Sequence, residues 1–275
     1  MNSKKTFKAA VVQMNSQPDL NLNLETAGRF ISETAADGAS FVVLPENFAF
    51  YGWPSERKSR SATIFKKTTQ FLSEKARELG IYLLGGGFPE PVEADEKGRI
   101  YNRAELFNPE GESAAIYRKL HLFDVAVSPD TTYRESDNVK PGDQATVIAD
   151  MENLGKLGLS ICYDIRFPEL YRKMADTGVE HIAIPSAFTL RTGMAHWETL
   201  VRTRAIENQA YVFAAAQTGK HGKKMKTFGH AMIVDPWGTV IADAGTEPGY
   251  TTAQVDRGFL EDVRKRLPAL THRIL

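Results

Sequence analysis

A single cysteine, Cys162, is the first residue of this sequence that points to chemistry. It ends the apolar run 156–162, and a helix-like segment begins within a few residues of it, around Pro168. Reactive groups of α/β proteins gather at the carboxyl ends of strands, where this thiol is expected to lie. Because a lone cysteine forms no internal disulfide, the thiol is available for packing, metal binding or nucleophilic catalysis.

Two charged residues hold equivalent positions at the ends of other apolar runs. Glu46 closes Phe-Val-Val-Leu-Pro-Glu-Asn, and Lys119 closes Ala-Ala-Ile-Tyr-Arg-Lys. If the strands are parallel neighbours, the three side chains meet on one rim of a sheet. The carboxylate could then take the thiol proton, while the ammonium and the backbone N–H of Tyr163 stabilise an oxyanion. The set predicts acyl transfer to a cysteine nucleophile.

Each of these residues also fits an ordinary structural role. A lone cysteine is often a small buried hydrophobe, and glutamate or lysine at a strand end is usually solvated. His181 is near Cys162 in the sequence, but it stands at the entry of an expected strand rather than in a papain-type pair. The interpretation therefore depends on the segments that surround the three residues.

The elements that must position these residues alternate along the chain. Apolar runs predict strands at 8–14, 40–45, 82–86, 103–107, 113–117, 156–162, 181–185, 210–216, 230–234, 240–243 and 251–255. Helices are expected at 22–37, 62–79, 168–176, 195–208 and 258–265. Hairpin-like turns at 108–111 and 235–238 favour two packed sheets with helices outside over a pure βαβ order. The segment 122–147 shows no periodicity and is expected to be an irregular loop, a candidate lid.

Composition restricts the class of protein. The length of 275 residues, without a repeat or a linker, predicts one domain over 1–275. The net charge of zero gives no support for a nucleic acid or an acidic membrane as partner. The basic start lacks an apolar stretch and a cleavage site, so we expect no signal peptide, and no run is long enough to span a membrane. One cysteine suits a reducing compartment, which favours the cytoplasm.

The segments around the three residues resemble those of the nitrilase superfamily of carbon–nitrogen hydrolases. These are Leu-Pro-Glu-Asn at 44–47, Tyr-Arg-Lys-Leu-His-Leu-Phe-Asp at 117–124 and Cys-Tyr-Asp-Ile-Arg-Phe-Pro-Glu-Leu at 162–170. Further segments, at 185–198, 204–217 and 229–238, are similar to the Nit branch in particular. The resemblance covers essentially the whole chain.

The resemblance implies a four-layer α-β-β-α sandwich that assembles as a homodimer or larger homo-oligomer through a helical face. It implies that Glu46 is the general base, Lys119 the oxyanion stabiliser and Cys162 the nucleophile. Glu135 stands where the family often has a second glutamate, which would orient Lys119. No metal and no cofactor are implied.

Two amidase activities of the Nit branch fit the sequence. One hydrolyses deaminated glutathione to 2-oxoglutarate and cysteinylglycine, and the C-terminal motifs resemble that group more. The alternative is ω-amidase action on 2-oxoglutaramate or 2-oxosuccinamate. Both substrates end in a 2-oxo acid, which Arg166 would bind, and the segment from Phe188 to Thr192 would line the acyl pocket. Met194 stands where these relatives commonly carry proline, and His196 and Trp197 fit either a site wall or packing.

Other classes of function are less well supported. The run Gly85-Gly86-Gly87 after an apolar strand suggests a nucleotide-binding protein, but neither Gly-x-Gly-x-x-Gly nor a Walker A loop follows. The six histidines show no metal-hydrolase spacing. A scaffold that kept the fold and lost the chemistry stays open, as do the hydrolysis of nitriles and of carbamoyl amides, because substrate choice depends on loop shape.

Overall fold

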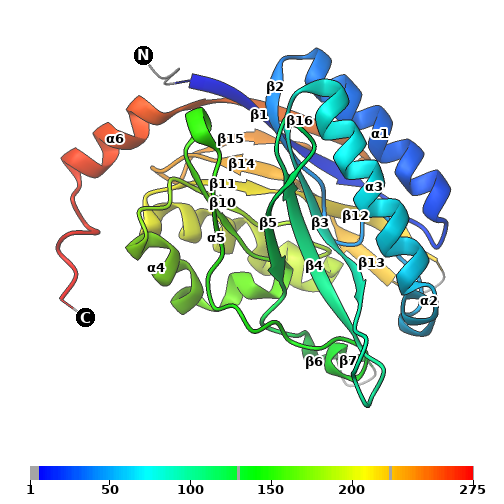
Figure 1. Cartoon of the computed structure of the whole chain (residues 1–275). Helices are drawn as coiled ribbons and strands as arrows, with labels where there is room; N and C mark the ends of the chain where they lie inside the picture. Colours follow the sequence, from blue (N-terminus) through cyan, green and yellow to red (C-terminus); the bar gives the residue numbers. More distant parts are fainter. Residues whose placement is uncertain (1–5, 129–130, 223–224, 275) are drawn as a thin grey trace.

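Two β-sheets lie face to face between two layers of helices (Figure 1). The computed structural model describes residues 6–128, 131–222 and 225–274. Apolar side chains fill the space between the sheets, where the rings of Phe41 and Phe213 meet edge to face with centroids 5.2 Å apart. A second apolar cluster separates the large sheet from the helices on its outer face. This is the α-β-β-α sandwich that the resemblance implied.

The large sheet is mixed. Its strands follow the order β13 (Met225–Phe228), β12 (Ala216–His221), β1 (Thr6–Met14), β2 (Ala39–Val43), β3 (Tyr82–Pro91), β4 (Ile100–Phe107) and β5 (Ser113–Arg118), and β16 (Gly249–Asp256) pairs antiparallel with β1. Both faces of this sheet are covered. In β1, for example, Ala9 and Val11 face the core between the sheets, while Ala10 and Val12 face the outer helices.

The small sheet carries the cysteine segment. Its order is β15 (Val240–Asp243), β14 (Met232–Val234), β11 (Tyr211–Ala214), β10 (His181–Ala183), β9 (Lys156–Leu159) and β8 (Ile148–Asp150). A separate hairpin joins β6 (Asp124–Ser128) to β7 (Thr131–Arg134). The chain passes directly from β11 of the small sheet to β12 of the large one, so the two sheets are linked beside the site.

Helices cover the outer faces of both sheets. The large sheet carries α1 (Leu20–Ala36) and α3 (Ser61–Leu79), and the short α2 (Pro54–Ser59) precedes α3. The small sheet carries α4 (Pro168–Asp176) and α5 (Leu190–Asn208), and α6 (Arg257–Arg266) follows β16. Asp19 caps the N-terminus of α1, where its carboxylate accepts from the N–H groups of Asn21 and Leu22.

Most expected elements are present, with ends that differ by a few residues. The expected strand 210–216 is two strands in different sheets, because the chain changes sheet at Ala215. The expected strand 156–162 ends at Leu159, and Cys162 begins a short 3₁₀ helix. The helix expected from 195 begins at Leu190, and Gly193 within its first turn donates its N–H to the carbonyl of Thr189.

The segment 122–147, expected to be irregular, contains the hairpin β6–β7 and a 3₁₀ turn at Glu135–Asp137. Strands this short carry too few residues for a visible alternation. Residues 129 and 130 of this segment lie outside the described residues. Residues 1–5 do so too, and they belong to the basic start on which the expectation of no signal peptide rests. None of the helices in the described part of the chain combines the length and the apolar character that a membrane crossing requires.

Candidate active site

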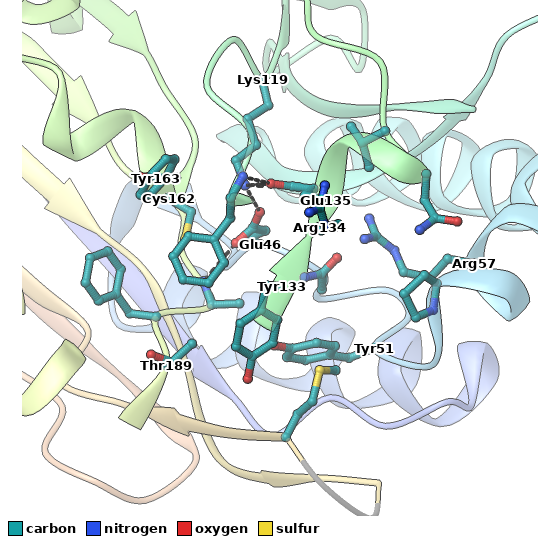
Figure 2. Close-up of a pocket in the computed structure, with 18 of the residues that line it drawn as sticks. Glu46, Tyr51, Arg57, Lys119, Tyr133, Arg134, Glu135, Cys162, Tyr163 and Thr189 are labelled. Carbon is teal, nitrogen blue, oxygen red and sulfur yellow. Dashed lines mark hydrogen bonds and ion pairs between the residues drawn. The ribbon is translucent and has the colours of Figure 1, made fainter. Parts of the chain in front are cut away.

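Glu46, Lys119 and Cys162 meet at the wall of one pocket (Figure 2). The ammonium of Lys119 lies 3.1 Å from Oε1 of Glu46. The thiol of Cys162 interacts with the same carboxylate through a side-chain hydrogen bond. All three residues are buried, with 4, 2 and 8% of their surface exposed. The three side chains that the sequence analysis selected therefore lie together in one cluster.

The cluster forms between the two sheets and not along one rim. Glu46 follows β2 and Lys119 follows β5, two strands of the large sheet that β3 and β4 separate. Cys162 follows β9 of the small sheet. The expectation of parallel neighbouring strands is therefore wrong, although the side chains meet, because the face-to-face packing of the sheets brings their edges together.

Glu46 is held by donors on three sides. Its Oε1 accepts from Nδ2 of Asn102 at 2.8 Å, and its Oε2 accepts from the backbone N–H of Ala187 at 3.0 Å. Burial alone would raise the pKa of Glu46, but the charge of Lys119 and the hydrogen bonds from Cys162 and Lys119 lower it below the usual 4.5. The carboxylate is therefore ionised at neutral pH and has a fixed orientation.

Two glycines make room for Glu46. A Cβ on Gly87 would lie 2.8 Å from Cγ of Glu46 and 2.5 Å from Oδ1 of Asn102. A Cβ on Gly86 would lie 2.3 Å from the carbonyl oxygen of Leu44 and 2.4 Å from Cβ of Pro185. The Gly85-Gly86-Gly87 run, considered above as a phosphate cradle, is a packing feature of β3 behind the carboxylate.

Lys119 lies between two carboxylates. Its Nζ is 3.1 and 2.9 Å from the two oxygens of Glu135, in addition to its contact with Glu46. Burial alone would lower the pKa of Lys119, but the charges of Glu135 and Glu46 raise it well above its usual value. The ammonium is therefore charged at neutral pH.

Glu135 is fixed by the backbone of a neighbouring segment. Its Oε2 accepts from the N–H of Phe123 at 2.7 Å, and the residue begins the 3₁₀ turn that follows β7. Asp124 in turn accepts from the N–H of Ser136 at 3.0 Å. The hairpin that replaces the expected loop thus places Glu135 against Lys119.

Cys162 occupies a strained position in its turn. Its φ of 49° lies in the left-handed region, which non-glycine residues rarely adopt. The backbone N–H of Cys162 donates to the carbonyl of Pro185 at 3.0 Å, which joins the turn to the end of β10. Burial and the charge of Glu46 raise the pKa of the thiol well above its usual value, against the opposing effect of Lys119. The resting residue is therefore a protonated thiol.

Asp164 fixes the turn that carries Cys162. Its fully buried carboxylate accepts from the N–H of Ile161 at 2.8 Å and from the hydroxyl of Tyr117, also at 2.8 Å. Its other oxygen accepts from the N–H of His121 at 3.0 Å. One carboxylate therefore joins the turn after β9 to the segment that carries Lys119.

The pocket beside the cluster has a volume of about 180 Å³. Tyr163, Phe188 and Thr192, all selected from the sequence, lie in its lining together with Glu135. Arg166 is not among the lining residues. Its Nη2 lies 3.3 Å from Nδ1 of His196, and its guanidinium carbon is 5.3 Å from the centre of the Phe188 ring.

Other residues discussed from the sequence have structural surroundings. Trp197 is fully buried and donates its indole N–H to the carbonyl of His230 at 2.8 Å, so it packs the core. Met194 is 71% exposed and lies within α5, which begins four residues before it at Leu190. His181 lies 2.8 Å from the carbonyl of Leu154 through Nε2 and forms no papain-type pair with Cys162.

Several residues of the site were not identified from the sequence. Asn102 and the N–H of Ala187 hold Glu46, and Arg57, Tyr133 and Arg134 line the pocket. Asn102 carries no clear signal, because Arg103 and Glu105 in the same strand are also polar. Arg57 carries no signal either, because its segment Pro-Ser-Glu-Arg-Lys-Ser has the composition of a solvated surface.

Comparisons with known proteins agree with this geometry. A model of the carbon-nitrogen hydrolase family matches residues 8–265. A deaminated glutathione amidase of Synechocystis is 46% identical over 98% of this chain and 99% of its own. The ω-amidase NIT2-A of Xenopus laevis is 38% identical over 97% of this chain and 95% of its own.

Solved structures show the same fold. The NitFhit protein of C. elegans superposes with a TM-score of 0.91 and 38% identity over 98% of this chain, which spans 65% of that protein. A mutant amidase of Nesterenkonia, with acrylamide added at the active-site cysteine, superposes with a TM-score of 0.78 and 27% identity. That match covers 95% of this chain and 98% of the amidase. With the family model spanning nearly the whole sequence, this chain belongs to the carbon-nitrogen hydrolase family.

Proposed function

We propose that this protein is a cysteine-dependent amidase that cleaves a linear amide through a thioester acyl-enzyme. The observation that carries the proposal is the convergence of Glu46, Lys119 and Cys162 on one pocket wall. The family supplies the class of bond, and the modified cysteine of the Nesterenkonia amidase supports a cysteine nucleophile. We also propose that residues 1–275 form a single domain.

Acylation begins with the neutral thiol of Cys162. Because the thiol is protonated and Glu46 ionised in the resting site, the proton moves to Glu46 as sulfur attacks the amide carbon. The C–S bond forms, and the carbonyl oxygen becomes an oxyanion beside the ammonium of Lys119 and the N–H of Tyr163. The C–N bond then breaks, and Glu46 gives its proton to the leaving nitrogen.

Deacylation uses the same groups with water as the nucleophile. Glu46 takes a proton from water, which adds to the thioester carbon under the same oxyanion stabilisation. The C–S bond breaks, the acid is released, and the proton returns to sulfur. Glu135 is a positioning residue in this scheme, because both of its oxygens contact Lys119 and one is fixed by the backbone of Phe123.

The substrate that we propose is deaminated glutathione, which gives 2-oxoglutarate and cysteinylglycine. The name of the Synechocystis relative, at 46% identity, supports this choice. The ω-amidase reaction on 2-oxoglutaramate or 2-oxosuccinamate is the second candidate, which the Xenopus relative at 38% identity supports. Phe188 and Thr192 would contact the acyl chain, since both line the pocket. A contact of Arg166 with the 2-oxo acid end stays a prediction.

We further propose a homodimer or larger homo-oligomer in the cytoplasm. Large apolar side chains are exposed on α5 and on the turn that packs beside it, among them Met194 at 71%, Ile206 at 49% and Trp237 at 61%. Exposed apolar surface of this kind is typical of an interface between protein chains. The single cysteine supports a reducing compartment.

The test is a parallel steady-state assay on deaminated glutathione and 2-oxoglutaramate, with the Cys162→Ala variant as blank. A much higher kcat/KM for deaminated glutathione is the expected result. Preference for 2-oxoglutaramate would instead assign the protein to the ω-amidases. If neither is hydrolysed while Cys162 is still alkylated by iodoacetamide, the proposed substrate class is wrong.

A further inference from the structure

Arg57 stands out among the pocket residues because part of its guanidinium has no partner. Its Nε and Nη2 are buried, and neither forms a hydrogen bond within the described residues. Arg57 comes from the short helix α2 and lines the same pocket as Cys162. Figure 2 shows its guanidinium on the side of Glu46 and Glu135 that is remote from Cys162.

Two buried nitrogens of a cation that have no partner are costly to a folded protein. A buried charge is normally paired, and a buried donor without an acceptor loses the full free energy of its hydration. Burial lowers the pKa of Arg57, while the more distant charges of Glu135 and Glu46 raise it, so the guanidinium remains protonated. Those carboxylates attract Arg57 without contacting it, because their own hydrogen bonds go to Lys119 and to neighbouring donors.

The two unpartnered nitrogens are arranged to bind a carboxylate through two parallel hydrogen bonds. Nε and Nη2 form one edge of the planar guanidinium, and their N–H bonds are nearly parallel. A carboxylate offers two oxygens at a matching separation and accepts two such bonds at once. Arg134 and Lys226 line the same pocket and add positive charge to it.

We propose that Arg57 binds a carboxylate of the substrate through this edge and so fixes the remote end of the substrate while Cys162 attacks its amide. The inference rests on the proposed amidase function and adds a specificity-determining residue to it. Deaminated glutathione carries two carboxylates, one at the 2-oxo acid end and one at the glycine end. Either carboxylate could accept the same pair of hydrogen bonds from Arg57. Substrates that carry only one of the two carboxylates show which one Arg57 binds.

The test compares Arg57→Gln and Arg57→Lys with the wild type. Arg60→Gln is the matched control, since it removes a neighbouring exposed arginine that stacks on Phe50. The four substrates are deaminated glutathione, 2-oxoglutaramate, N-butanoyl-cysteinylglycine and butanamide. For Arg57→Gln, kcat/KM on deaminated glutathione is expected to fall by about ten- to a hundredfold, mainly through KM. Arg57→Lys keeps the charge and loses the paired donors, so its kcat/KM on deaminated glutathione should fall less than that of Arg57→Gln. The kcat/KM of Arg60→Gln should equal that of the wild type.

The pattern across substrates identifies the carboxylate. A parallel loss on 2-oxoglutaramate assigns Arg57 to the 2-oxo acid end, and a loss on N-butanoyl-cysteinylglycine assigns it to the leaving group. An equal loss on butanamide, or no loss on any substrate, would overturn the proposal, since Arg57 would then act through Glu46 or not at all. If the wild type hydrolyses none of these amides, the proposed amidase function is wrong, and the role of Arg57 that rests on it is wrong as well.

A binding measurement separates affinity from chemistry. Titration calorimetry of deaminated glutathione into Cys162→Ala measures a dissociation constant without turnover. The further change Arg57→Gln in that protein is expected to weaken binding about ten- to a hundredfold. The melting temperature of the free Arg57→Gln protein should not fall, because the change removes two buried donors that have no acceptor. Unchanged binding with a lower melting temperature would make Arg57 a structural residue.

Discussion

The hydroxyl of Tyr117 donates a hydrogen bond of 2.8 Å to Oδ2 of Asp164, which ties the strand before Lys119 to the turn that carries Cys162. Each residue is fully buried. Because Lys119 comes from one sheet and Cys162 from the other, their relative position depends on contacts of this kind. The relative position of Lys119, the proposed oxyanion stabiliser, and Cys162, the proposed nucleophile, is thus fixed by residues that lie behind them and outside the pocket lining.

Tyr117→Phe tests that relationship. Removal of the hydroxyl leaves one lone pair of a buried carboxylate unsatisfied, so the free energy of unfolding should fall by about 1–3 kcal/mol. We expect kcat to fall more than KM changes, because the substituted residue positions catalytic groups and does not line the pocket. Urea unfolding and steady-state kinetics measure the two effects. Loss of stability with an unaltered kcat would show that the tie does not govern the geometry of the site.

Cys162→Ala should abolish turnover and leave the fold intact. The thiol is the proposed nucleophile, and the small alanine side chain fits the space that the buried cysteine occupies. Circular dichroism and thermal unfolding check the fold, and the assay described above checks turnover. Hydrolysis at the wild-type rate in this variant would exclude the covalent mechanism.

Lys119→Ala should lower kcat/KM by about 10²–10³-fold, or about 3–4 kcal/mol, because the oxyanion loses its ammonium. A second effect separates this role from simple disruption of the site. The charge of Lys119 is the main force that lowers the pKa of Glu46 against burial. In the wild type, the acid limb of kcat/KM should therefore lie below pH 4.5, the usual value for glutamate.

The same limb should move to higher pH in Lys119→Ala, because Glu46 then remains buried beside Glu135 without the intervening cation. The pH dependence of kcat/KM in the two proteins measures the shift. A loss of less than tenfold, or an unmoved acid limb, would contradict the assigned role of Lys119.

His181 should make the fold sensitive to acid. Burial lowers its pKa to about 4, against the usual 6.5, and its Nδ1 has no hydrogen-bond partner within the described residues. As pH falls below 6.5, His181 becomes protonated in the unfolded chain but stays neutral in the folded protein. The stability that the neutral ring contributes is present above pH 6.5 and is lost between there and pH 4, a loss of about 3 kcal/mol.

Urea unfolding across this pH range checks the prediction. His181→Phe removes the titrating group and keeps a ring against Phe7, so its free energy of unfolding should depend less on pH than that of the wild type. His272→Phe, at an exposed position, is the control and should follow the wild type. Equal pH dependence in all three proteins would assign the acid sensitivity to other groups.

The catalytic candidates could be predicted from the sequence because each ends an apolar run. Glu46, Lys119 and Cys162 are chemically reactive residues at the places where apolar runs of the sequence end, and that pattern is visible without a structure. Their meeting place could not be predicted correctly, because strand order and the pairing of two sheets are long-range properties. The expected rim of one sheet is in fact the junction of two.

The groups that surround the catalytic candidates were harder to predict. The N–H of Ala187 donates to Glu46, but a backbone donor leaves no mark in the residue type. Arg57 lies in a charged segment that has the composition of a solvated surface, yet two nitrogens of its guanidinium are buried at the pocket. Arg166, by contrast, was selected because the family resemblance implied a place near the pocket, and its guanidinium faces His196 and Phe188.

The two glycines behind Glu46 limit how this protein can change. Gly86 and Gly87 leave no space for even a methyl group between the carboxylate, Asn102 and the ends of both sheets. Any larger residue at Gly86 would press on the Leu44 carbonyl and Pro185, and one at Gly87 on Asn102 and Glu46, so we expect both positions to stay glycine. A lineage of such enzymes would have to acquire new substrates by altering the front of the site, in α2, the β6–β7 hairpin and the start of α5. The segments that hold the catalytic carboxylate and the segments that would select the substrate are thus different parts of the chain, and they can evolve at different rates.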